Sequence, residues 1–344
     1  MESIDYIGLD VHKKSITYCI KTASGRVRAE GTIPATKQEL TEWATGLRRP
    51  WVGALEATLF TGWVYDQLLP YARRLRVGHA ARLRFIAASK KKNDRVDAGK
   101  LADLLRCDLF PDCYMAPKLM RDLRRMLRFR NTIVAQAVRM KNKMAGLLME
   151  VGEPFNKRKL HGQRYFAELL DSLQEVPDSV IELLQMSRGM LEMFQGAQRQ
   201  LVQALREHEQ LRERVRRLMS IRGVGEVTAL TWALEVCDPH RFGSVRQAVS
   251  YCGLCSAQDN SGGVEHRGPI SKQRNKHLQS MLIEAAKLAP RWNPELAAVH
   301  ERELQRGNRN RATLAVARRL VAYLLAVDKR GTDFVPRIPS AAAA

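Results

Sequence analysis

The feature that most constrains this chain is a change of hydrophobic pattern near residue 112. Before it, short apolar segments alternate with stretches of helical spacing, whereas beyond it the helical spacing is almost continuous. Short apolar segments separated by helices are typical of a sheet with helices packed on it, and continuous helical spacing is typical of helical assemblies. The sequence therefore predicts an α/β region followed by an all-α region.

The order of the elements in the first region narrows the fold. Strands are predicted at Tyr6–Leu9, Ser15–Lys21, Val27–Ile33, Trp51–Leu55 and Leu75–Val77. Helical spacing at Leu40–Leu47 follows the third strand, a second helix follows the fourth, and a third helix follows the fifth. The order βββαβαβα is that of RNase H-like folds. By analogy of order alone, we expect an RNase H/RuvC-like domain over residues 1–112.

Four acids in this region form a candidate metal site. Asp10 ends the first strand and Glu56 ends the fourth, while Asp94 and Asp97 are spaced to share one face of a helix. Phosphoryl transfer with Mg²⁺, or alternatively Mn²⁺, needs several carboxylates around one point. An acid in an apolar run, such as Glu56, also needs a partner or a metal. Asp10 and Asp94 could instead cap a turn or a helix, and His12 is predicted at the surface rather than on a metal.

The net charge points to a polyanionic partner. The chain carries 57 Lys and Arg against 36 Asp and Glu, a formal charge of +21. Such an excess does not help a compact fold, but it favours binding to nucleic acid. We find no apolar run of about 18 residues and no signal peptide, so we expect no membrane partner and a cytoplasmic, nucleoid-associated protein.

The central region, residues 113–219, holds two long helical stretches. Residues 116–146 contain nine Lys and Arg but one acid, Asp122, and so one-sided a run indicates a phosphate-facing surface. The candidate nucleic-acid contacts there are Arg121, Arg124, Arg125, Arg128, Arg139, Lys141 and Lys143. Residues 178–218 carry a heptad-like apolar stripe. Two interpretations stay open for it: a helical hairpin packed on residues 116–150, or a coiled-coil dimer arm.

The C-terminal region, residues 220–330, opens with a glycine-containing turn before a helix. Gly223 and Gly225 there allow backbone N–H groups to approach a phosphate, as in helix-hairpin-helix DNA binders, although a tight turn alone would look the same. Residues 331–344 are expected to be a disordered tail.

A polar loop further along the C-terminal region contains a candidate nucleophile, Ser261. A Ser-Gly-Gly sequence is usually only flexible, but basic residues follow it that could hold a phosphate under attack by a serine. These basic residues are Arg267, Lys272, Arg274 and Lys276.

The motifs, taken in order, resemble one known family. They are Tyr6–Asp10, Leu55–Thr58, Asn93–Ala98, Ile221–Gly225, Gly253–Leu254, Ser261–Gly262, Arg267–Gly268 and Ile270–Lys272. They are similar to those of the insertion sequence 110 family of DEDD transposases, which are relatives of the pilin-gene invertase and are also called bridge RNA-guided recombinases.

The resemblance implies a fold and a mechanism. It implies a RuvC-like domain, a coiled coil and a C-terminal helical transposase domain, with dimers assembling into tetramers. It implies that Asp10, Glu56, Asp94 and Asp97 hold Mg²⁺, that Ser261 forms a phosphoserine link to DNA, and that a noncoding bridge RNA pairs with donor and target DNA. Two alternatives remain: a RuvC-like Holliday-junction endonuclease that uses water, and a non-catalytic nucleic-acid-binding protein.

Overall fold

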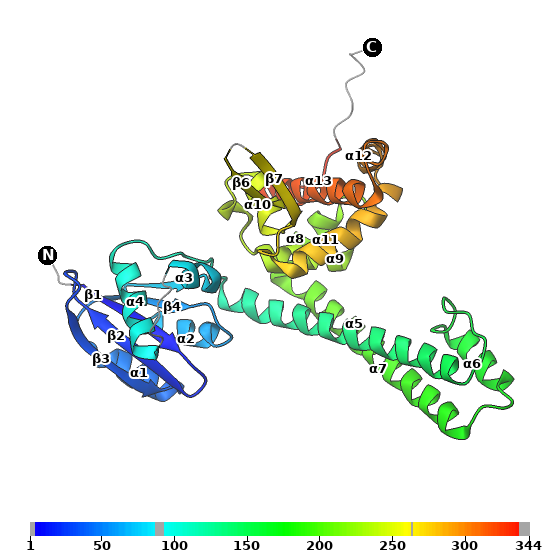
Figure 1. The fold of residues 1–344 in the computed structure, drawn as a ribbon, viewed down its shortest axis with the longest axis horizontal. Coiled ribbons are helices and arrows are strands. Elements are labelled where there is room, and N and C mark those ends of the chain that lie inside the picture. Colours follow the sequence, from blue (N-terminus) through cyan, green and yellow to red (C-terminus); the bar gives the residue numbers. More distant parts are fainter. Residues whose placement is uncertain (1–3, 87–92, 263, 337–344) are drawn as a thin grey trace, which may run out of the picture. The chain divides into compact units, whose positions relative to one another are not determined.

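A computed structural model describes residues 4–86, 93–262 and 264–336 of the chain (Figure 1). Its contacts divide the chain into two compact units, residues 1–121 and 122–344. The predicted central and C-terminal regions therefore lie almost entirely within the second unit. Among the described residues, no helix combines the length and the apolar character that crossing a membrane requires.

The first unit is built on a mixed five-stranded sheet. Its strands are β1 (Asp5–Val11), β2 (Ser15–Lys21), β3 (Val27–Pro34), β4 (Trp51–Glu56) and β5 (Arg74–Gly78). They lie in the order β3-β2-β1-β4-β5. The pairs β1–β2 and β2–β3 are antiparallel, whereas β1–β4 and β4–β5 are parallel. Every strand lies where the apolar pattern predicts it, so the predicted α/β character of this region is confirmed.

Helices cover both faces of this sheet. They are α1 (Lys37–Thr45), α2 (Thr61–Leu68), α3 (Ala80–Ile86) and α4 (Asp94–Arg106). The side chain of Asn93 caps α4 by accepting a hydrogen bond of 2.8 Å from the backbone N–H of Val96. The cap is therefore Asn93 and not Asp94, which leaves the Asp94 carboxylate available for another role.

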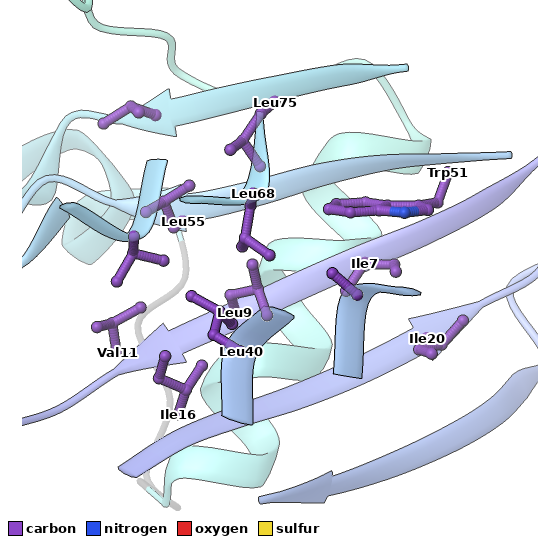
Figure 2. Packing of buried hydrophobic residues seen from close by; sticks show 13 residues of the cluster. Ile7, Leu9, Val11, Ile16, Ile20, Leu40, Trp51, Leu55, Leu68 and Leu75 are labelled. Atoms are coloured by element: carbon purple, nitrogen blue, oxygen red, sulfur yellow. The ribbon is translucent and has the colours of Figure 1, made fainter. Parts of the chain in front are cut away.

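The core of the first unit follows from the alternation of its strands. Ile7 and Leu9 of β1 point to one face, where they pack with Leu55 of β4, Leu40 of α1 and Leu68 of α2 (Figure 2). On the opposite face, a smaller cluster joins the sheet to α3 and α4. The sheet is thus held from both sides, and α4 is fixed on the face opposite to α1 and α2.

The second unit begins with a helical arm. Its helices are α5 (Lys118–Glu150), α6 (Gln163–Ser172) and α7 (Asp178–Glu207). Leu184 and Leu191 from the predicted heptad stripe pack with Met144 and Leu148 of α5 in one buried cluster. Figure 1 shows α5 and α7 side by side, joined through α6. The stripe is therefore used inside the chain, as the hairpin interpretation requires.

The remainder of the second unit is a helical domain that carries one β-hairpin. The helices are α8 (Glu209–Met219), α9 (Glu226–Val236), α10 (Val245–Tyr251), α11 (Lys276–Leu288), α12 (Pro294–Gln305) and α13 (Arg309–Arg330). Residues 228–236 of α9 are all buried, so this helix is the centre of the domain. Of the expected tail, residues 337–344 lie outside the described residues.

The hairpin departs from the predicted all-helical region. It consists of β6 (Ser256–Ser261) paired antiparallel with β7 (Val264–Ile270). The strands are mostly polar and lack the apolar alternation by which a strand is recognised in a sequence, so this segment is predicted only as a loop. The structure describes the backbone but not the side chains of residues 259–261 and 264–267.

Candidate active site

Two parallel strands bring Asp10 and Glu56 to the same edge of the sheet. In the β1–β4 pair, Gly8 lies opposite Ala54, so the acids two residues further on lie at neighbouring positions near the carboxyl ends of the strands. Because alternate residues of a strand point to opposite faces, both acids share the face of Gly8 and Ala54. Helix α4 covers this face, since Ala54 packs against Leu101.

Gly8 determines how closely α4 approaches the sheet. A β-carbon at Gly8 would lie only 1.9 Å from the backbone oxygen of Ala98 in α4. A glycine is therefore required for the helix backbone to rest directly on β1. Since α4 begins at Asp94, this close packing brings the first helical turn, with Asp94 and Asp97, to the sheet edge where Asp10 lies.

Asp10, His12 and Asp94 form a compact cluster. The Nε2 atom of His12 lies 3.3 Å from Oδ2 of Asp10 and 3.5 Å from Oδ1 of Asp94. One ligand atom from each of the three lies within 4.8 Å of the others. The Asp10 side chain is 17% exposed, whereas those of His12 and Asp94 are about half exposed, at 52% and 55%. The cluster therefore opens to solvent and can receive an ion.

Charge is crowded around Asp10. Burial is the largest effect and raises its pKa above the ordinary value of 3.8, and the nearby charges of Asp94 and Asp97 raise it further. His12 opposes them through its charge and its hydrogen bond, without cancelling the rise. A carboxylate in this state gains from a cation beside it. Oxygen ligands with an imidazole nitrogen suit a divalent metal ion.

Glu56 and Asp97 lie outside this compact cluster. Asp97 is one helical turn beyond Asp94, and its Oδ1 accepts a hydrogen bond of 3.2 Å from Nζ of Lys100. Glu56 is half-buried, and its backbone oxygen accepts a hydrogen bond of 2.8 Å from the Thr61 hydroxyl. Within the described residues, the structure thus places Asp10, His12 and Asp94 in one ligand group, while Glu56 ends the neighbouring strand and Asp97 lies in the first turn of α4.

His12 is the residue whose role the sequence interpretation undervalued. It is exposed, as predicted, yet it contacts both acids of the cluster. Its signal is the spacing from Asp10, because residues two apart in an extended segment point to the same side. The alternation therefore favours His12 near the acids instead of arguing against it.

Ser261 ends β6 at the tip of the hairpin in the second unit. The backbone pairs Ser261 with Val264, and Gly262 between them has φ +59°, a conformation that favours glycine. The side chains of Ser261 and Arg267 lie outside the described part of the structure. The nucleophile prediction thus rests on the sequence and on the position of this residue in the turn.

Two family models match the chain. The model of the DEDD transposases of the IS110 type matches residues 7–152, which include all four predicted acids. The model described as "Transposase IS116/IS110/IS902 family" matches residues 215–301, which include Ser261. Together the two matches cover more than half of the sequence. The chain belongs to the IS110 family of transposases. It is therefore a DNA-processing enzyme, and the DEDD domain implies that it uses a divalent metal ion.

Curated relatives of this transposase are also transposases. A probable family 20 transposase of Pseudomonas aeruginosa is 26% identical over 77% of this chain and 82% of its own length. The transposase for insertion sequence element IS1328 of Yersinia enterocolitica is 25% identical over 71% of this chain and 73% of its own. The transposase for element IS1111A of Coxiella burnetii is 27% identical, and this chain spans about half of it, 54%.

Three of the arginines predicted to bind nucleic acid already have hydrogen-bond or ion-pair partners within the transposase. Arg121 pairs with Asp66 in the first unit. In the second unit, Nε of Arg124 donates to the backbone oxygen of Leu234 at 2.8 Å, and Arg128 forms two hydrogen bonds of 2.8 Å to Glu235. These contacts give each of the three a structural role that the one-sided charge pattern could not reveal.

The other basic residues of α5 that are predicted to contact phosphate have no buried partner among the described residues. Arg125 and Arg139 are exposed, as is Lys143, while Lys141 is half-buried. Arg125 has a surface contact of 3.2 Å with Asp122, and Lys143 has one of 3.7 Å with Glu150. Exposed pairs of this kind are worth little and are easily exchanged for a phosphate. Nucleic-acid contact stays a prediction for these four basic residues.

Glu235 is the centre of a buried polar network that the sequence did not reveal. Its carboxylate is 0% exposed and binds the Arg128 fork as well as Nδ2 of Asn275 at 2.8 Å. Burial acts to raise the pKa of Glu235, but Arg128, Asn275 and Arg124 outweigh it and hold the pKa below its ordinary value of 4.5. Its position on the central helix α9 ties α5 to α11.

Among the predicted phosphate contacts of the C-terminal region, some have a structural role inside the fold and others are exposed. Gly223 has φ +93°, and a β-carbon there would lie 2.8 Å from Cα of Ala289, so packing alone requires glycine. Gly225 is the N-cap residue before α9 and provides no side-chain cap, and a β-carbon there would meet nothing within 4 Å. The predicted phosphate contacts Lys272, Arg274 and Lys276 are exposed.

Proposed function

We propose that this transposase cleaves and rejoins DNA strands with an RNase H/RuvC-like domain and a serine nucleophile. The metal site is supported by the cluster of Asp10, His12 and Asp94 and by the position of Glu56 at the end of the strand paired with that of Asp10. The strand order β3-β2-β1-β4-β5, with the first three strands antiparallel, supports the RNase H-like assignment.

The four acids would hold Mg²⁺, with Asp10 and Asp94 as the innermost ligands. When bound, the ion stabilises the charge that develops on the attacking and leaving oxygens. The protein's part is positional. Gly8 lets α4 approach the sheet, the Asn93 cap leaves Asp94 available, and His12 orients both carboxylates through its contacts.

Ser261 would attack the phosphorus of the scissile phosphodiester. The bond between Oγ and phosphorus forms while the bond from phosphorus to the leaving deoxyribose oxygen breaks. The serine hydroxyl loses its proton and the leaving oxygen gains one, so the number of phosphoester bonds is conserved and rejoining needs no other energy source. Support for this role comes from the position of Ser261 at the turn of a hairpin, in a segment followed by basic residues.

A noncoding bridge RNA, together with donor and target DNA, is the proposed polyanionic partner. The exposed basic residues of α5 and of residues 272–276 support it, and so does the net charge of +21. Such contacts would recognise backbone shape and charge, while sequence would be read by base pairing.

A second copy of the chain is the proposed partner for the outer face of α7. Leu183, Met186, Met190 and Met193 are 43–61% exposed and are spaced 3, 4 and 3 residues apart. This is the spacing of a coiled-coil seam. The stripe lies one residue, or roughly 100°, around the helix from the buried stripe that packs on α5. One helix can therefore serve both the intramolecular hairpin and a dimer, from which a tetramer would assemble.

A covalent-complex assay tests the proposal. Purified protein, its candidate noncoding RNA, Mg²⁺ and labelled donor and target DNA are combined and resolved on denaturing gels. Wild type is compared with Ser261→Ala and Asp10→Ala. We expect a protein–DNA adduct in wild type that is absent from both variants.

Other outcomes would favour the alternatives. Cleavage that survives Ser261→Ala but not Asp10→Ala, without an adduct, would contradict the serine mechanism and indicate a RuvC-like nuclease that uses water. Nucleic-acid binding that is unchanged in both variants, with no cleavage by wild type under any metal condition, would indicate a non-catalytic binding protein.

A further inference from the structure

A pocket in the second unit is lined mainly by arginine and glutamine side chains. Its volume is about 340 Å³, within the range of roughly 300–1,000 Å³ that ligand sites occupy. The lining residues that matter are Arg130 of α5, Gln198, Arg199, Gln203 and Arg206 of α7, and Glu226 of α9. Neither the metal cluster nor the hairpin of Ser261 contributes to this lining.

Arg130 is the least satisfied of these side chains. Its Nη1 donates to Oδ1 of Asn131 at 3.2 Å, but its Nε is buried and has no partner among the described residues. Burial lowers its pKa, although an arginine stays charged at neutral pH. A buried donor without a partner costs free energy, so the Arg130 side chain is destabilised in the free protein.

The charges of the pocket do not cancel. Glu226 is the one acid of the lining, and it lies 3.5 Å from Arg206, which also contacts Glu207 at 3.6 Å. Arg206 is thereby largely offset. No ion pair joins Arg199 to an acid in the part of the chain that the structure describes, so Arg199 and Arg130 are left as uncompensated positive charges.

We propose that this pocket binds a phosphate group between Arg130 and Arg199. Guanidinium groups match phosphate oxygens with paired N–H donors, and both Arg130 and Arg199 line this pocket. The volume leaves room for the atoms attached to the phosphate, with the amide of Gln198 beside them, while the amide of Gln203 donates to Glu207 at 2.9 Å. The phosphate belongs either to a nucleic-acid backbone, which rests on the proposed function, or to a small phosphate compound, which does not.

The test separates these two sources with the full-length protein. Arg130→Gln and Arg199→Gln are compared with wild type and with Arg212→Gln, an exposed arginine of α8 that removes the same charge away from the pocket. One arm measures binding of a fluorescein-labelled 20-nucleotide single-stranded RNA over a range of salt. The other measures the rise of Tm with inorganic pyrophosphate.

We expect each pocket variant to lose about tenfold in affinity for the RNA, as is typical of a hydrogen bond to a charged group. The slope of log K against log salt should fall by about 0.7, the effect of one phosphate contact on a single strand. Arg212→Gln should retain both. A loss confined to the pyrophosphate arm would assign the pocket to a small phosphate compound. Unchanged binding in both arms would overturn the proposal.

Stability distinguishes a ligand site from a structural role for Arg130. Because its Nε is unsatisfied, Arg130→Gln should leave the Tm of the free protein equal to or above that of wild type. A lower Tm with full binding of both probes would overturn the proposal. Arg199→Gln is at an exposed position, so it tests binding even if Arg130→Gln folds poorly. An Asp10→Asn protein should bind both probes like wild type in buffer without Mg²⁺, which separates failure of the pocket from failure of the proposed catalysis.

Discussion

Two carboxylates of this transposase, Asp10 in the first unit and Glu235 in the second, are both largely withdrawn from water but have opposite surroundings. Glu235 receives the fork of Arg128 and the amide of Asn275, and its pKa is lowered. Asp10 faces further acids with one imidazole beside it, and its pKa is raised. The basic groups around Glu235 outweigh the cost of its burial, whereas the single imidazole beside Asp10 does not offset burial and the neighbouring acids.

The difference shows how a structural acid can be told from a functional one. A buried carboxylate with its cations in place stabilises the fold and requires nothing from outside. A carboxylate crowded with others lowers stability and persists where a ligand or a reaction uses it. The same logic applies to Arg130, whose buried Nε lacks a partner among the described residues.

The contrast predicts its largest effect at Asp10. Asp10→Asn removes a metal ligand and should lower the rate of strand cleavage about 10³-fold or more, because metal ligands supply several kcal/mol of transition-state stabilisation. It should not lower the Tm in metal-free buffer, since it also removes repulsion from Asp94 and Asp97. Cleavage assays with Mg²⁺ and thermal melts with EDTA measure the two effects. If both the Tm in EDTA and the cleavage rate fell in Asp10→Asn, Asp10 would be a structural acid like Glu235.

The complementary change should act on stability. Glu235→Ala leaves Arg128 without its counter-charge and should destabilise the second unit by about 3 kcal/mol, the lower end for a broken buried pair, because Arg128 can reach solvent. Glu284→Ala on the surface of α11 is the matched control and should change stability by less than about 0.5 kcal/mol. Urea unfolding followed by circular dichroism measures both. Equal effects of the two variants would contradict the structural role of Glu235.

The sequence predicts one of these two carboxylates and not the other, for a physical reason. Asp10 and Glu56 end apolar strands, and parallel pairing carries strand ends to one edge, so local pattern is enough. Glu235 meets Arg128 and Asn275 from distant helices, and no local spacing encodes such contacts. For the same reason, charge counting cannot separate the arginines of α5 that are used inside the fold from those that are exposed.

Glycine positions show the same limit. The sequence places Gly8 in a motif, but only the packing of α4 on β1 explains why no side chain fits there. The hairpin of residues 256–270 is missed because its polar strands pair through backbone hydrogen bonds, which leave no hydrophobic pattern.

The next largest effect is expected at Gly8, because this glycine lets α4 bring its acids close to the sheet. The effect should be on the rate of cleavage. Gly8→Ala would force α4 away from β1 and shift Asp94 and Asp97, and a displacement of about 1 Å can lower a rate about 10²-fold. The control is Gly99→Ala in the same helix, where a β-carbon would come no closer than 3.9 Å to its neighbours. Cleavage rates of the two variants, measured with Mg²⁺, provide the test. Equal rates would show that the spacing of α4 does not set the site.

The smallest predicted effect is on how folding stability changes with pH. The contributions of Asp10 and Glu235 to this change should have opposite signs. The folded pKa of Glu235 lies below 4.5, so its stabilisation is present above about pH 4.5 and is lost as pH falls through the folded pKa. The folded pKa of Asp10 lies above 3.8, so the folded state is favoured below that value and loses stability as pH rises through the raised pKa. In metal-free buffer at pH 7, Asp10→Asn should therefore be more stable than wild type, and Glu235→Ala less stable. Both differences should shrink between pH 7 and pH 4, which calorimetric melts at the two values would measure. If both variants were more stable than wild type, or both less stable, the contrast between Asp10 and Glu235 would be wrong. The fold would then either stabilise both carboxylates or destabilise both.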